Sequence, residues 1–130
     1  MSGDTPFSLG PIGQIAVPVQ DLDAAVAFYR DTLGLSFLFR APPGLAFFDC
    51  AGIRLLLSIP ETDEIARHSS VIYFKVDDIQ AAYQALRERG APFDDEPHMI
   101  AQMETYDLWM AFLRDPAGNL LGIMSESARG

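Results

Sequence analysis

Two segments of this chain are nearly the same, and they lie about half a chain apart. Residues 13–25 read GQIAVPVQDLDAA and residues 70–82 read SVIYFKVDDIQAA, so that Asp21, for example, matches Asp78 at a constant offset of 57. A repeat of this kind within 130 residues predicts two copies of one supersecondary unit, because each copy is too short to bury the faces of its own sheet alone. We therefore expect a single domain over residues 1–130.

The first copy, residues 12–59, is expected to fold as a βαβββ unit. The alternating strand IAVPV leads into a helix that Asp21 can cap and Gly34 can end. Three further strands follow, LSFLFRA, LAFFDC and IRLLLSI, separated by the turn signals PPG and AG. Alternation along the first strand places Gln14 on the sheet face opposite the helix, where a ligand could lie.

The second copy, residues 71–126, repeats this order. Strand VIYFKV is followed by the helix DIQAAYQALRERG, capped by Asp77 or Asp78, and by strands near FDDEPHMIA, DLWMAFLRD and NLLGIMSE. A proline, a charge run and two serines mark residues 60–70 as a linker between the copies. The predicted fold class is α+β, with two βαβββ repeats forming one curved mixed-sheet domain.

Composition and charge narrow the range of partners. The formal net charge of −9 disfavours nucleic acids and anionic membranes as partners, whereas it permits a cationic small ligand. No apolar run approaches the roughly 18 residues of a membrane span, and the first residues do not resemble an export signal, so we expect a cytoplasmic protein. Cys50 is the only cysteine, which excludes an intramolecular disulfide and a cysteine-based zinc site.

The repeats, the helix phrase DLDAAVAFYRDTLGL and the late phrase RDPAGNLLGI together resemble the vicinal oxygen chelate superfamily of glyoxalase I, bleomycin-resistance proteins and extradiol dioxygenases. The resemblance runs from about Ile12 to Glu126. It implies the fold of that superfamily and a homodimer. It does not imply one reaction, because the fold hosts lyases, dioxygenases and drug-binding proteins that catalyse nothing.

The metal site that the resemblance implies lacks most of its ligands in this sequence. Enzymes of the superfamily hold a divalent metal with a His, Glu or Gln from each of the first, fourth, fifth and eighth strands. By position these ligands fall on Gln14, Leu56, Val71 and Gly122. Three of these residues offer no side-chain donor, and a lone amide is a poor metal ligand, so we expect no metal and no other cofactor. Gln14 is then either a hydrogen-bond partner of an organic ligand or a structural amide.

Other side chains could carry chemistry or binding. His98 and Glu104 lie six residues apart, which suits a hairpin across which they could form an acid/base pair or a displaced metal site. His68, in the linker, is read as an exposed surface residue. A pocket for a small molecule needs polar and aromatic side chains together. The candidate ligand-binding residues are Gln14, Phe47, Arg54, Tyr73, His98 and Trp109.

These observations favour a small-molecule binding protein without the usual metal site, which would bind or sequester an organic ligand in the groove of the sheet. The alternative is a glyoxalase-like lyase or isomerase with an atypical or displaced metal site that uses Gln14, His98 and Glu104. A third function is a noncatalytic module whose sheet face pairs with another protein. The sequence leaves open whether the chain is an enzyme.

Overall fold

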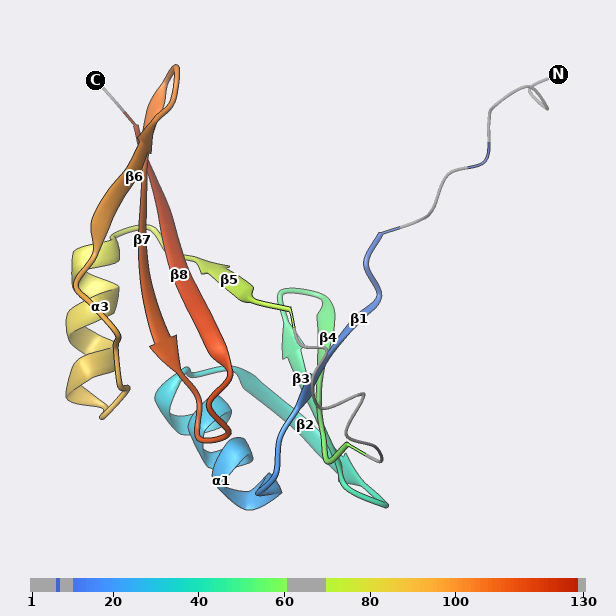
Figure 1. Ribbon diagram of the computed structural model, residues 1–130. Helices are drawn as coiled ribbons and strands as arrows, with labels where there is room; N and C mark the ends of the chain where they lie inside the picture. The colour runs from blue at the N-terminus through green and yellow to red at the C-terminus, as the bar shows by residue number, and fades with distance from the viewer. Residues whose placement is uncertain (1–6, 8–10, 61–69, 129–130) are drawn as a thin grey trace, which may run out of the picture.

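The computed structural model describes residues 7, 11–60 and 70–128, which form two βαβββ units (Figure 1). Most of the predicted linker, with His68, lies outside these residues. The first unit contains β1 (Gln14–Pro18), α1 (Leu22–Ala27), the π-helical turn η1 (Phe28–Thr32), β2 (Ser36–Ala41), β3 (Leu45–Cys50) and β4 (Ile53–Ser58). The second contains β5 (Ile72–Lys75), α3 (Ile79–Glu88), β6 (His98–Gln102), β7 (Tyr106–Arg114) and β8 (Leu120–Ala128).

Each unit builds its own four-stranded mixed sheet. The strand orders are β1-β4-β3-β2 and β5-β8-β7-β6, and in both sheets the first strand runs parallel to its neighbour while the other pairs are antiparallel. The predicted α+β class with two βαβββ repeats is confirmed. The strands divide between two hydrogen-bonded sheets, however, and do not continue from one unit into the other.

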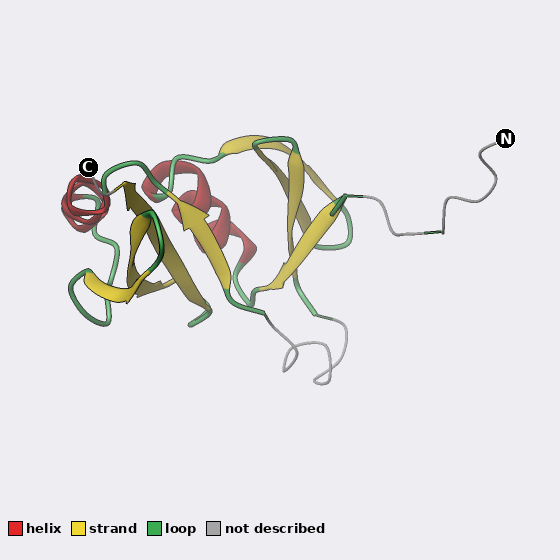
Figure 2. Ribbon diagram, turned by 90° about the horizontal axis from the view of Figure 1, so that it is seen from above, coloured by secondary structure: helices red, strands yellow, loops and turns green. Residues whose placement is uncertain are grey.

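The helices begin where the sequence predicts. The Asp21 carboxylate accepts a hydrogen bond from the backbone N–H of Ala24 at 3.1 Å, and Asp78, not Asp77, does the same for Ala81 at 3.1 Å. α1 lies between the two sheets, whereas α3 covers the outer side of the second sheet (Figures 1 and 2). No helix among the described residues is long and apolar enough to span a membrane.

One strand of the second unit covers only part of the phrase that indicates it. The sequence predicts a strand near FDDEPHMIA, and β6 covers only the last four residues of that phrase, beginning at His98. Before it, Phe93 forms an isolated bridge with Leu113. Pro97 precedes β6 directly and has no N–H to donate to a ladder, which is consistent with the start at His98.

The hydrophobic core contains side chains from both units. Fully buried side chains of the first unit include Tyr29, Phe48 and Leu57, and those of the second include Leu113 and Leu121. They belong to one hydrophobic cluster, so the units stabilise each other by shared burial.

A buried carboxylate joins the units. Asp115, only 4% exposed in the β7–β8 turn, accepts the Tyr29 hydroxyl at 2.9 Å and the backbone N–H groups of Ala117 and Asn119 at 2.9 and 2.8 Å. The Asn119 amide also donates to the carboxylate and to the carbonyl of Pro18 in β1. Burial, and then the Asp115 charge and hydrogen bond, raise the pKa of Tyr29 well above its ordinary value. Asp115 and Asn119 of the DPAGN phrase therefore link the two halves through hydrogen bonds to the first unit.

Candidate functional site

Each sheet has one face packed on the core and one face turned away from it, which we call the open face. Burial alternates accordingly: in β1, Val17 is buried while Gln14 and Ala16 are exposed. The first open face carries Gln14, Ala16, Pro18, Phe39, Leu45, Phe47, Asp49, Arg54, Leu56 and Ser58. The second carries Tyr73, Lys75, His98, Leu108, Met110, Phe112, Gly122, Met124 and Glu126.

A hydrogen-bonded pair marks one end of the first open face. Gln14 and Arg54 are register partners in β1 and β4, and the Arg54 Nε donates to the Gln14 side-chain oxygen at 3.0 Å. Both side chains are exposed. The sequence placed Gln14 on this face, but the pairing with Arg54 follows only from the strand register.

Aromatic rings lie beside this pair. Phe39 and Phe47 stack with their ring centroids 4.7 Å apart and an interplanar angle of 29°. The Arg54 guanidinium lies 5.8 Å from the Phe47 centroid, within the range of a cation–π contact. Planar rings and a flat cation thus present one surface on which a planar molecule could stack.

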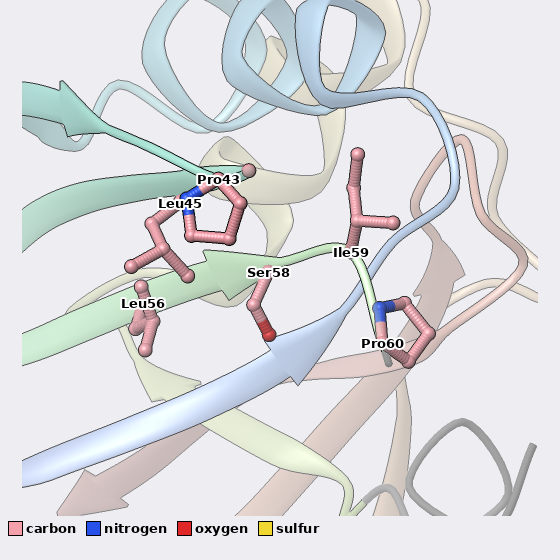
Figure 3. Close-up of a pocket in the computed structure, with 7 residues that line it drawn as sticks. Pro43, Leu45, Leu56, Ser58, Ile59 and Pro60 are labelled. Atoms are coloured by element: carbon pink, nitrogen blue, oxygen red, sulfur yellow. The ribbon is translucent and has the colours of Figure 1, made fainter. Parts of the chain in front are cut away.

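A pocket of about 540 Å³ opens at the other end of the same face (Figure 3). Leu45, Leu56 and Ser58 reach it from β3 and β4, and Ile59 and Pro60 close it beyond the end of β4. The lining is apolar apart from the Ser58 hydroxyl and backbone groups. The sequence does not predict this pocket, because neither the turn between β2 and β3 nor the segment of Ile59 and Pro60 carries a pattern specific to a cavity.

On the second open face, one aromatic ring covers a glycine. Tyr73 and Gly122 are register partners, and a Cβ on Gly122 would lie 2.7 Å from the Tyr73 ring and 3.3 Å from the Phe112 ring. The two rings meet edge to face, with centroids 5.9 Å apart. Tyr73 still exposes 45% of its surface, so its ring both covers Gly122 and remains open to a ligand.

The polar side chains Lys75 and His98 of the second face already have partners. Lys75 Nζ lies 3.1 Å from a Glu126 carboxylate oxygen. His98 pairs with Met110 across β6 and β7, and its Nδ1 lies 3.1 Å from the carbonyl oxygen of Glu96. This face therefore offers methionine and aromatic surface more than free charge.

The structure separates the predicted acid/base pair. His98 begins β6, opposite Met110, whereas Glu104 lies in the turn that follows Gln102 at the other end of the hairpin. The hairpin forms as predicted, but the four residue steps from His98 to Gln102 span about 13 Å of strand. His98 and Glu104 consequently do not form a catalytic pair in this structure.

Trp109 lies apart from the other candidate residues. It is half-buried and packs against the core cluster, on the helix side of the second sheet. Its register partner Ser125 is buried there too. The strand alternation that places Met110 on the open face therefore turns Trp109 away from it.

The residues present do not fit the metal of the superfamily enzymes. The Gln14 oxygen already accepts a bond from a cation, Arg54, which would repel a metal ion at that position. The Tyr73 ring occupies the space that a side chain at position 122 would need, and Leu56 and Val71 supply no donor. Among the described residues, no three His, Cys, Asp or Glu side chains group together as a metal site.

A hollow of about 830 Å³ lies between the two units on the core side. Leu35, Cys50, Phe74 and Arg89 are among the residues that line it. Burial, reinforced by the charge of Asp49, raises the pKa of the Cys50 thiol, which keeps it protonated and a poor nucleophile.

Comparisons with known proteins agree with this architecture. The sequence profile of the Glyoxalase/Bleomycin resistance protein/Dioxygenase superfamily matches residues 11–123. The uncharacterized protein YraH of Bacillus subtilis (strain 168) is 30% identical over 123 residues, which cover 85% of this chain and 94% of YraH. A lactoylglutathione lyase from Agrobacterium tumefaciens has a similar structure, with a TM-score of 0.73, 28% identity and coverage of 90% of this chain and 94% of the lyase.

An antibiotic-binding protein shares the fold as well. TnmS3 from Streptomyces sp. CB03234 superimposes with a TM-score of 0.74 at 23% identity, over 94% of this chain and all of TnmS3 (100%). On the evidence of the matched profile and of YraH, this chain belongs to the Glyoxalase/Bleomycin resistance protein/Dioxygenase superfamily.

Proposed function

We propose that this chain is a small-molecule binding protein that holds or sequesters an organic ligand on its open sheet faces without a metal. The observation that carries the proposal is the arrangement of the first open face. There the Gln14–Arg54 pair, the stacked ring of Phe47 and the apolar pocket near Leu45 lie along one surface. A few fixed polar groups beside apolar and aromatic surface are what small-molecule sites generally contain.

Two further observations support binding over turnover. The positions of the superfamily's metal ligands hold an arginine-bonded amide and side chains without donors. The fold also serves proteins that bind organic molecules, since TnmS3 is described as an antibiotic-binding protein. The ligand-binding residues that we propose are Gln14, Phe47, Arg54, Tyr73 and His98 on the open faces. Trp109, which the sequence groups with them, packs on the core side and is not included.

A thermal-shift screen with compounds of positive, negative and zero charge, followed by calorimetry, tests this function. Ligands are expected to raise the melting temperature of the wild type and to lose affinity in Phe47→Ala. Phe93→Ala is the matched control, because Phe93 is another half-buried phenylalanine but packs on Tyr83, away from the open faces. A screen without any ligand, or equal losses in both variants, would contradict the proposal.

The competing function is a glyoxalase-like lyase, and the 28% identity to the lactoylglutathione lyase is the observation in its favour. It requires Gln14, His98 and Glu104 to act around a displaced metal. Elemental analysis after incubation with zinc, nickel, manganese and iron, together with assays on lactoylglutathione, tests it. Stoichiometric metal and turnover that His98→Ala abolishes would favour the lyase over the binding protein.

We also propose a homodimer. The open faces leave large apolar side chains exposed, among them Phe39 at 50% and Tyr73 at 45%. A second copy facing them would bury this surface and turn each open face into one wall of a groove. Light scattering is expected to give twice the mass of the chain, and a monomer at micromolar concentration would contradict the dimer.

A further inference from the structure

The polarity of the first open face indicates what class of ligand it accepts. We infer that the Gln14–Arg54 pair is a receptor for hydrogen-bond acceptors, so that the site takes a planar aromatic ligand with a carboxylate, phenolate or carbonyl oxygen at one end. This inference rests on the proposed binding function and specifies its ligand.

The first step of the argument is the orientation of the Gln14 amide. A guanidinium has N–H donors and no acceptor, so the group that receives the Arg54 Nε–H must be the carbonyl oxygen of Gln14. The amide nitrogen of Gln14 therefore points away from Arg54. Among the described residues, the NH₂ group of Gln14 and the two terminal nitrogens of Arg54 bond no acceptor, so these donors remain available to a ligand.

The second step concerns the nearest anion, Asp49. It is the register partner of Arg54 on β3, yet Arg54 turns toward Gln14 on the other side, and Asp49 accepts the backbone N–H of Gly52 at 3.2 Å. Among the described residues, no carboxylate lies within ion-pair distance of the Arg54 guanidinium. The second open face differs, because Glu126 neutralises its cation, Lys75.

The third step is the length of the site. Along β4, Arg54 belongs to the polar pair, Leu56 lies beside Phe47, and Ser58 lies at the apolar pocket. Residues four apart on a strand are separated by about 13 Å, the length of a linear three-ring molecule with a carboxylate. Such a ligand could bond the donors at one end, stack on Phe47 and place its apolar end in the pocket.

Three probes of one shape test the inference: anthracene-2-carboxylate, anthracene-2-carboxamide and (anthracen-2-yl)methylammonium, each titrated by probe fluorescence. The carboxylate is expected to bind more tightly than the ammonium probe by tenfold or more, with the carboxamide between them. NMR signals of the Gln14 side-chain amide and the Arg54 Nε–H should shift on addition of the carboxylate.

Variants with the same change in net charge test whether the affinity for the carboxylate probe depends on the Gln14–Arg54 pair or on the net charge of the protein. Arg54→Leu and Lys75→Leu each remove one positive charge from an exposed position, but only Arg54→Leu should weaken the carboxylate probe by tenfold or more. Gln14→Glu, an isosteric change that keeps a partner for Arg54, should reverse the preference toward the ammonium probe.

The outcomes distinguish this inference from the proposed function. If the ammonium probe binds more tightly, or if both leucine variants lose affinity equally, the inference is wrong while ligand binding stands. If none of the probes binds, the inference is also wrong, and the wider screen then decides the proposed function. If no compound of any charge stabilises the protein, the proposed function fails as well.

Discussion

Ala16 and Leu56 in the first half correspond to Tyr73 and Gly122 in the second, yet the sizes are exchanged. In the first half the small residue is on the edge strand and the large one on its neighbour, whereas in the second half a large edge residue covers a glycine. Each pair combines one small and one large residue, so the two pairs fill similar volumes. The difference shows that the repeat preserves volume and backbone while it frees the open faces to take different chemistry.

The turns before the last strand of each half also differ. In the β3–β4 turn, Asp49 is exposed and accepts one backbone N–H, that of Gly52. In the β7–β8 turn, Asp115 is buried and accepts both backbone and side-chain donors, including Tyr29 of the other half. Asp49 therefore stabilises only its own turn, whereas Asp115 links the second half to the first.

The largest expected loss of stability is at Asp115, and Asp49 provides its comparison. Asp115→Ala should lower the free energy of unfolding by about 3 kcal/mol, because several buried donors lose their acceptor together. Asp49→Ala is the control and should cost about 0.5 kcal/mol or less, since its bond is exposed. Urea denaturation measures both, and similar losses in the two variants would refute a special role for the buried carboxylate.

The next largest loss of stability is expected at the pair of Tyr73 and Gly122. Gly122→Leu should cost about 2 kcal/mol, because the new side chain meets the Tyr73 and Phe112 rings. Adding Tyr73→Ala copies the first half's arrangement and should recover most of that loss. A double-mutant cycle by thermal or urea denaturation measures the coupling, and purely additive losses would show that the two positions do not share one space.

The contribution of Tyr29 to the free energy of unfolding should decrease at alkaline pH. Its pKa is raised in the folded protein above the ordinary value of about 10, so the stability that its hydroxyl contributes is present below pH of about 10 and is lost as the pH rises above it. Tyr29→Phe should cost about 1 kcal/mol near neutral pH, and its difference from the wild type should shrink above pH of about 10. Denaturation at a series of pH values tests this, and a difference that stays constant with pH would contradict it.

The smallest effect concerns a hydroxyl in the core of the second half. Ser125 is 1% exposed, and its Oγ has no hydrogen-bond partner among the described residues. Ser125→Ala should leave stability unchanged or raise it by up to about 1 kcal/mol, because it removes an unsatisfied polar atom. Thermal denaturation measures the change, and a clear loss would mean that the hydroxyl does have a partner.

The sequence predicted most of the fold and part of the site. The repeat, the caps Asp21 and Asp78, and the alternation that exposes Gln14 were all readable, because they depend on local spacing. The separation of His98 from Glu104 was not, since it depends on where the β6–β7 hairpin takes its register. The position of Trp109 on the core side depends on the same register.

The sequence by itself determined that this chain has two βαβββ units, and which positions lack metal-binding side chains. Those properties depend on residue type and on periods of a few residues. Only the tertiary structure decided that Arg54 bonds Gln14, that Tyr73 covers Gly122 and that Asp115 reaches Tyr29. Each of these contacts joins residues more than 39 positions apart in the chain, and no local pattern specifies such a distance; strand pairing and shared burial do.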